Sequence, residues 1–448
     1  MVRSLRTDLA KIIKRYRHDA AYRELLHTSF RSLSVRGLGV TTGFLVTWLT
    51  ARYFSPESLG VVSICLAILS LASVGSKLGY DVALMRFIAA FAQEQRLDSV
   101  KGIYITSMKR VLPLTILIAL LLFVTAPYMA NNFFHKPHLV FVLQINAIVL
   151  LPLTVLQIHA ECLRALTRVG EYTFFQTAAI SSLAVAGLLI ALAIGLSDEV
   201  PVYIQFICIS AAAMISTFRW FRVSGYLLRT TEHSVTAKAL HQVAAPMFTT
   251  TIMQLLMSWA GTLVLAVYQP EATVGIYNAL VRISVFTNIT ILAINGLMMT
   301  RFVAAFHSGN LTELKSQSHE ATKLIFITAL PLFVVLLAFP EQLLSIFGPD
   351  FVHYKMELFV LLAGQFIVVC AGLPSQLLNM TDRQHVLRNI SIVAALVNVV
   401  SCLIFIPMYG MLGACWAQFV GTLVWNILCI SSVSRRMNII TFIGLSSR

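Results

Sequence analysis

The chain has 448 residues, of which 58% are apolar and only 12% are charged, and its mean hydropathy is +0.82. A water-soluble protein of this length needs far more charge to cover its surface, so the composition excludes a soluble globular protein. The formal net charge of +14 at pH 7 makes both nucleic acid and anionic lipid candidate partners.

The N-terminal segment, residues 1–30, is rich in Lys and Arg and has neither an apolar core nor a small-residue cleavage site. It is therefore not a secretory signal peptide. We expect a basic, partly amphipathic segment on the cytoplasmic face, where anionic lipid attracts Lys and Arg. The alternative is a plain topology signal without a further role.

Twelve apolar runs of about 20 residues follow, which is the length that spans a hydrocarbon core about 30 Å thick. They lie near residues 34–53, 58–78, 108–129, 138–160, 172–196, 200–221, 243–267, 274–300, 320–339, 354–376, 388–408 and 411–432. The sequence lacks the alternating segments of about ten residues that are typical of a transmembrane β-barrel. It therefore predicts an all-α integral membrane protein with about 12 transmembrane helices.

Positive charge is distributed unevenly between the predicted connections. With a basic N-terminus inside, the outer connections contain only Arg52, Lys136 and Lys355 as cations, and nearly all other Lys and Arg fall on the inner side. This bias predicts a multi-pass protein with both termini in the cytoplasm. Topology explains the net charge, so no nucleic acid partner is expected.

A short phrase occurs twice, as RFIAAF from Arg86 and as RFVAAF from Arg301. Gly60 and Gly275 each lie 26 residues before these arginines, so the two copies share an offset of 215 residues. A repeat with six spans per copy predicts two six-helix bundles related by a parallel internal repeat, with a cleft between them. The expected divisions are an N-terminal bundle at 31–224, a cytoplasmic linker at 225–240, a C-terminal bundle at 241–434 and a cytoplasmic tail at 435–448.

Arg282 is the clearest ionisable residue within a predicted span, and the first copy of the repeat has Ala67 at the same place. An ionised side chain near the bilayer centre costs roughly 2.5–3.5 kcal/mol on insertion scales, so it needs a reason. A guanidinium about 10 Å inside the membrane can form a forked contact with a diphosphate. The alternative is that it snorkels to the outer interface or pairs with a carbonyl group.

Four other charged residues carry weaker predictions. Arg36 and Lys77 are candidate diphosphate contacts near the inner side, and Asp81 is a candidate for coupling or gating. The alternatives are an interfacial anchor for Arg36 and a self-neutralising i, i+4 pair on one helix face for Lys77 and Asp81. Arg86 and Arg301 fall beyond the span length from the outer glycines, which predicts interfacial anchors.

The remaining motifs indicate packing. The seven cysteines lie in or beside apolar runs without C-x-x-C spacing, so neither disulfides nor a metal site are expected. Gly39 and Gly43 have the G-x-x-x-G spacing that lets helices approach closely. Amides within spans are expected to hydrogen-bond between helices or, for a few, to accept sugar hydroxyls; they are Gln144, Asn146, Gln157, Gln254, Asn278, Asn288, Asn295, Gln365 and Asn398.

Three phrases resemble a known group of transporters: RYFSPESLGVVSICLAILSLASVGSKLGYDVALMRFIA, VGIYNALVRISVFTNITILAINGLMMTRF and PMYGMLGACWAQ. They are similar to bacterial polysaccharide exporters of the multidrug/oligosaccharidyl-lipid/polysaccharide superfamily, particularly O-antigen type flippases. The resemblance implies a flippase in the bacterial inner membrane that moves undecaprenyl-diphosphate-linked oligosaccharide, a precursor of O-antigen, capsule or exopolysaccharide, to the periplasmic leaflet. It also implies membrane lipids and other polysaccharide assembly proteins as partners.

Two alternatives stay open. A drug or organic-cation exporter of the same superfamily would need buried Asp or Glu, and no acid lies at mid-span. A glycan polymerase or ligase would need a large outer loop, and the outer connections are short. We therefore expect a transporter that works by alternating access, not an enzyme, with no cofactor and no metal. Coupling to a proton, a sodium ion or the membrane potential is compatible with the sequence.

Overall fold

The computed structural model describes residues 20–94, 97–225, 237–381 and 383–443. Within these ranges the protein is helical and contains no β-strand. Most of the predicted linker and the first part of the predicted basic segment lie outside the described residues. Helix α2 begins at Ala20 and continues without a break through residue 30, the predicted boundary of that segment.

The first half of the chain folds into seven α-helices, α3 to α9, after α2. Their bounds, with the π-helical turns η1 to η3, are α2 Ala20–Leu49, η1 Thr50–Phe54, α3 Pro56–Lys77, α4 Tyr80–Gln93, α5 Leu97–Tyr128, η2 Met129–Phe133, α6 Leu139–Ala165, α7 Val169–Thr173, η3 Phe174–Ala178, α8 Ala179–Ile194 and α9 Val200–Ser224.

The second half continues with helices α10 to α17 and two 3₁₀ turns, η5 and η6. Their bounds are α10 Ala237–Tyr268, α11 Glu271–Val285, η5 Phe286–Asn288, α12 Ile289–His307, α13 Leu311–Ala338, α14 Pro340–Ser345, η6 Pro349–Phe351, α15 Lys355–Ala371, α16 Pro374–Met380 and α17 Gln384–Met437. Gly410 interrupts α17 with φ 58° and ψ −130°, so this long helix contains two of the predicted spans.

The predicted spans coincide with these helices, with differences of a few residues at their ends. Nine helices of the described residues are long and apolar enough to cross a membrane, and the bent pair α15 and α16 makes a tenth candidate. Since α17 holds two spans and α2 covers the first predicted run, an all-α protein with about 12 transmembrane helices is confirmed. All seven cysteines are free and buried, as packing residues would be.

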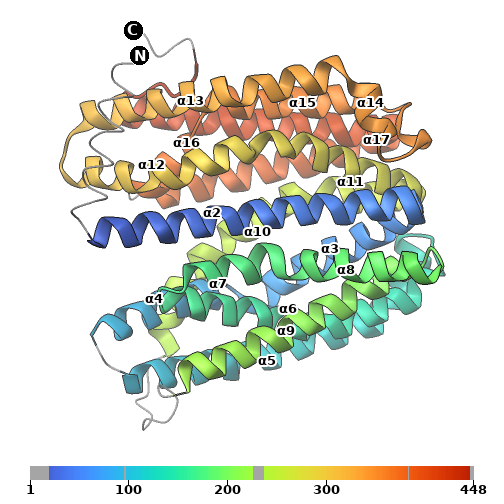
Figure 1. The fold of residues 1–448 in the computed structure, drawn as a ribbon, viewed down its shortest axis with the longest axis horizontal. Helices are drawn as coiled ribbons and strands as arrows, with labels where there is room; N and C mark the ends of the chain where they lie inside the picture. The colour runs from blue at the N-terminus through green and yellow to red at the C-terminus, as the bar shows by residue number, and fades with distance from the viewer. Residues whose placement is uncertain (1–19, 95–96, 226–236, 382, 444–448) are drawn as a thin grey trace.

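The helices form two groups that run side by side (Figure 1). Helices α5, α6, α8 and α9 pack in one group, and α12, α13, α15 and α17 pack in the other. Helix α2 packs on α8 and borders α11 and α12 of the second group. Helices α3, α10 and α11 carry the main contacts between the two groups.

The two groups meet most closely where α3 crosses α11, at the glycines that mark the repeat. A Cβ atom on Gly60 would lie 1.9 Å from the carbonyl oxygen of Glu271, and one on Gly275 would lie 2.0 Å from that of Pro56. No side chain fits between backbones at this separation. The equivalent glycines of the two copies therefore pack against each other's helix at the end of the molecule that is predicted to face outward.

Candidate functional site

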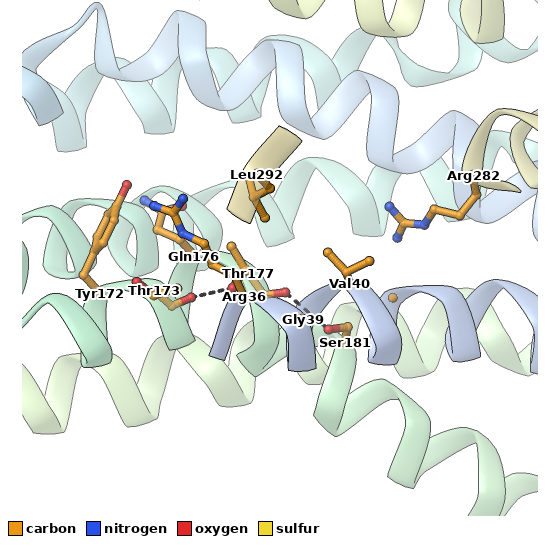
Figure 2. Close-up of a pocket in the computed structure, with 11 residues that line it drawn as sticks. Arg36, Gly39, Val40, Tyr172, Thr173, Gln176, Thr177, Ser181, Arg282 and Leu292 are labelled. Carbon is orange, nitrogen blue, oxygen red and sulfur yellow. Dashed lines mark hydrogen bonds between the residues drawn. The ribbon is translucent and has the colours of Figure 1, made fainter. Parts of the chain in front are cut away.

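A cavity of about 420 Å³ lies between the two helix groups and is lined by both candidate arginines (Figure 2). Arg36 reaches it from α2, in the first half of the chain, and Arg282 reaches it from α11, in the second half. The other lining residues come from α2, α7, η3, α8 and α12; they are Gly39, Val40, Gly43, Tyr172, Thr173, Gln176, Thr177, Ser181 and Leu292. The structure thus brings together two residues that are 246 positions apart in the sequence.

The guanidinium of Arg282 lies against the backbone of α2. A Cβ atom on Gly43 would lie 2.7 Å from Nη2 of Arg282, so the absence of a side chain at this position makes room for the guanidinium. Gly43 lies seven residues beyond Arg36, which is about 10 Å along a helix. Arg282 is therefore the deeper of the two cations when the cavity is entered from the predicted inner end.

The two arginines have no anionic partner in the part of the chain that the structure describes. No ion pair involves either of them, and the cavity lining contains neither Asp nor Glu. Arg36 is half-buried and Arg282 is exposed to the cavity. A cavity within the membrane that presents two uncompensated cations favours an anionic ligand over a cationic one.

Hydroxyl groups on α7, η3 and α8 form the wall opposite Arg36. Thr173, Thr177 and Ser181 recur every four residues, so they lie on one helix face. The Thr177 hydroxyl donates to the Thr173 carbonyl oxygen at 2.6 Å, and the Ser181 and Thr42 hydroxyls are 2.7 Å apart. The π-helical turn η3 falls within this wall, and such turns are frequent at functional sites.

Gly39 and Gly43 form the G-x-x-x-G pair, but they do different work. A Cβ atom on Gly39 would lie 2.7 Å from the Thr177 carbonyl oxygen, so at this point α2 does approach the neighbouring backbone closely, as the motif predicts. Gly43 instead accommodates the side chain of Arg282. The motif therefore holds one wall of the cavity in place and leaves space for its deeper cation.

Aromatic side chains close the outer side of the cavity beyond Arg282. Phe44 on α2 contacts Phe286 and Phe347 of the second half, with ring centroids 5.9 Å and 5.5 Å apart. Trp48, one turn farther along α2, donates from Nε1 to the Ile346 carbonyl oxygen at 3.0 Å. These contacts join the two halves between the cavity and the predicted outer end.

Polar contacts between the halves continue at the predicted outer end itself. Nζ of Lys136 donates to the Gln269 carbonyl oxygen at 2.8 Å and lies 3.7 Å from Oε1 of Glu271, which is also 3.0 Å from Nε2 of His138. Burial lowers the pKa of Lys136 from its ordinary value, and the negative charge of Glu271 opposes that change. The described conformation is thus closed on the outer side of Arg282.

Lys77 lies outside the lining of this cavity. Its Nζ is 2.8 Å from Oδ2 of Asp81, and the whole residue is only 6% exposed. The expectation that the pair shares one helix face is wrong, because α3 ends at Lys77 and α4 begins at Tyr80. Leu78 and Gly79 turn the chain with φ of 47° and 80°, and a Cβ on Gly79 would collide with the Ala244 carbonyl group.

We expect Asp81→Ala to destabilise the protein by about 2 kcal/mol. The reason is that it leaves the Lys77 ammonium buried without a partner, and the cost is below the roughly 3 to 5 kcal/mol of a fully buried pair because the Asp81 side chain is 17% exposed. The double variant Lys77→Met, Asp81→Leu is expected to recover much of this loss. Thermal denaturation in detergent measures both effects.

The surface pair of Lys355 and Glu341 supplies a matched control, since both side chains are more than a third exposed. Glu341→Ala should leave the melting temperature nearly unchanged. If Asp81→Ala is equally harmless, the ion pair does not hold the turn between α3 and α4 together.

Arg86 and Arg301, the predicted interfacial anchors, are both exposed and belong to α4 and α12. Their role as anchors stays a prediction. Among the described residues no group of His, Cys, Asp or Glu side chains could hold a metal ion.

Several lining residues were not predicted from the sequence. Tyr172, Gln176 and the hydroxyls of the opposite wall lie in runs that read as ordinary spans, and Gly43 was interpreted only as a helix-packing residue. The signal that could have found them is the spacing of Thr173, Thr177 and Ser181, which places three hydroxyls on one face of an otherwise apolar helix.

Two helix groups around a central cavity define a multi-pass membrane transporter fold, and solved structures share it. An inward-facing multidrug resistance MATE family transporter of the MOP superfamily matches with a TM-score of 0.71 and 14% identity, over 92% of this chain and 98% of that chain. The lipid II flippase MurJ in an inward closed conformation matches with a TM-score of 0.69 and 12% identity, over 91% and 87%. An outward-facing MATE transporter matches with a TM-score of 0.61 and 14% identity, over 92% and 95%. At these identities the likeness concerns the fold.

The chain belongs to the polysaccharide biosynthesis protein family, which it matches over residues 26–299. The MatE family also matches, over residues 246–404. No curated protein matches the sequence. Family and fold together make this protein a membrane transporter of the MOP superfamily, as the resemblance implied, and are those of transporters and flippases and not of catalytic enzymes.

Proposed function

We propose that this protein is a flippase for polyprenyl-diphosphate-linked oligosaccharides and carries precursors of a surface polysaccharide across the bacterial inner membrane. The observation that carries the proposal is the pair of arginines, Arg36 and Arg282, that line one cavity without an anionic partner among the described residues. A diphosphate diester has two negative charges, and two guanidinium groups can neutralise both with charge-assisted hydrogen bonds.

The position of the two arginines suggests an order of events. Arg36 is nearer the predicted inner end, so it meets a diphosphate that enters from the cytoplasmic leaflet first. Arg282 receives the diphosphate about 10 Å deeper. Rocking of the two halves then opens the contacts of Phe44 and Lys136 at the outer end and releases the substrate outward. Lys77 is neutralised by Asp81 and is not part of this path.

The absence of a carboxylate from the lining argues against export of organic cations. A cation in a low-dielectric cavity needs a negative partner, and the described lining offers only two positive side chains and neutral groups. Coupling to a proton, a sodium ion or the membrane potential stays a prediction, as does a role for Asp81 in it. The inner-membrane location with cytoplasmic termini is part of the same proposal.

Depletion of the protein in its host tests the proposal. Lipid-linked oligosaccharide should accumulate in the cytoplasmic leaflet, where it is detected in lipid extracts and is inaccessible to a membrane-impermeant oxidant of sugars applied to spheroplasts. Increased sensitivity to cationic drugs without accumulation of the precursor would instead identify a drug exporter.

A further inference from the structure

A second cavity, of about 290 Å³, lies within the second half of the chain and differs sharply from the first. Its lining has no charged residue but has five carboxamide side chains and an indole, together with hydroxyl and apolar groups. The carboxamides belong to Gln254 on α10, Asn295 on α12, Gln376 on α16, and Gln418 and Asn426 on α17, and the indole is that of Trp425. Three helices and a broken fourth thus direct amides into one space.

Helical spacing shows that this set is one face of α17. Gln418, Thr422 and Asn426 recur every four residues, so their side chains form one row along the cavity. Amides that only join neighbouring helices would be consumed by partners across the interface. Here the amide nitrogen of Asn426 donates to the Thr422 carbonyl oxygen of its own helix at 2.8 Å, which leaves its amide oxygen for another donor.

Asn295 provides an independent sign of a missing ligand. Its amide oxygen is buried and has no hydrogen-bond partner. Buried polar groups in folded proteins are normally satisfied by protein or by another molecule. An oxygen left open on the wall of an uncharged cavity calls for a donor such as a hydroxyl or N–H group.

The cavity is also built by a break in the helix that passes it. Helix α15 ends at Ala371 and α16 begins at Pro374 with a bend of 48°, which places Gln376 on the lining. Gly372 has a φ of 74°, and a Cβ there would lie 2.2 Å from the Thr322 hydroxyl oxygen. Irregular backbone at membrane depth is tolerated where it lines a cavity, so this break fits a binding site.

Helix α12 separates this cavity from the arginine cavity. Leu292 lines the first cavity, whereas its neighbours Ile291 and Asn295 line the second. A ligand with an anionic part and a neutral part linked to it can therefore contact both sides of one helix. The neutral part must offer both hydrogen-bond donors and acceptors, because carboxamides present both.

Resting on the proposed function, we infer that this amide cavity binds a neutral sugar unit of the lipid-linked oligosaccharide while the arginine cavity holds its diphosphate. Sugar hydroxyl and acetamido groups pair with the carboxamides, and the apolar face of a sugar ring packs on the indole of Trp425. The cavity volume is at the lower end of the range for ligand sites, which suits a short neutral segment. Specificity for the glycan would then lie in α17 and the α15–α16 break.

Binding of synthetic probes to the purified full-length protein tests the inference. The probes are bare undecaprenyl diphosphate and its glucosyl, galactosyl, N-acetylglucosaminyl and N-acetylgalactosaminyl derivatives. We expect at least one glycosylated probe to bind more tightly than the bare one, and Gln418→Leu and Asn426→Leu each to weaken that probe by about tenfold without weakening the bare diphosphate. Gln384→Leu, an exposed amide on the same helix, is the control and should change neither.

The outcomes separate this inference from the proposed function. Arg282→Ala should weaken the bare and glycosylated probes equally, and its failure to do so would overturn the diphosphate site. If Arg282→Ala acts as expected but the amide variants leave every glycosylated probe unchanged, or weaken bare and glycosylated probes alike, the sugar site is overturned. Melting temperatures near the parent value show that the variants are folded.

Discussion

Replacing Arg282 with alanine is expected to reduce transport of the lipid-linked oligosaccharide by roughly 10- to 100-fold, the value of one or two charge-assisted hydrogen bonds. Arg282 is the deeper cation of the cavity and lies against Gly43 without an anionic partner among the described residues. Arg282→Lys keeps the charge but loses the forked geometry, so it should retain part of the activity. Surface polysaccharide produced by a deletion strain carrying each variant measures the effect.

Arg301→Ala is the matched control, because Arg301 belongs to the next helix, α12, and its exposed side chain does not line the cavity. It should support normal polysaccharide display at equal protein levels. Unchanged display with both Arg282 variants would remove this residue from the transport path. An equal loss with Arg301→Ala would show that any lost arginine is harmful and that depth in the cavity is irrelevant.

The largest expected effect on stability comes from Gly275→Ala and Gly60→Ala, at about 3 kcal/mol or more each. At both positions a methyl group would meet backbone atoms at 2.0 Å or less, and backbone cannot move aside as a flexible side chain can. The two halves would have to separate where α3 crosses α11. The expected result is a strong fall in melting temperature, measured by thermal denaturation in detergent with size-exclusion chromatography.

Gly296→Ala provides the comparison, since Gly296 is exposed on α12 and an added Cβ has no heavy atom within 4 Å. Alanine favours the helical state over glycine, so this variant should be as stable as the parent protein or slightly more stable. A melting temperature for Gly275→Ala that equals that of Gly296→Ala would contradict the close crossing of the two halves.

Much of the fold could be predicted from the sequence because the membrane constrains it strongly. Apolar runs of spanning length located the helices, and the repeat marked by Gly60 and Gly275 identified the two glycines that meet at the crossing. The breaks were not predicted. The turn at Leu78 and Gly79 and the 3₁₀ turn after Arg282 lie inside or beside runs that remain apolar, so hydropathy carries no signal for them.

The candidate site was predictable only where charge marks it. Arg36 and Arg282 stand out because ionised groups within spans are costly, and the structure places both on one cavity. Gly43 and Thr177 did not stand out, because their meaning depends on which side chain lies opposite across a tertiary contact. The amides Gln254 and Asn295 were noted as polar groups within spans, but their convergence with α17 depends on the packing of several helices.

Flipping by the purified protein in liposomes tests the central claim most directly. A fluorescent undecaprenyl-diphosphate-linked oligosaccharide is placed in both leaflets, and an impermeant quencher reports the fraction that becomes accessible from outside. We predict complete accessibility in liposomes with the parent protein, and only outer-leaflet accessibility in empty liposomes and in those with Arg282→Ala. Parent-protein liposomes that behave like empty ones, while the same protein exports an organic cation, would contradict the proposed function.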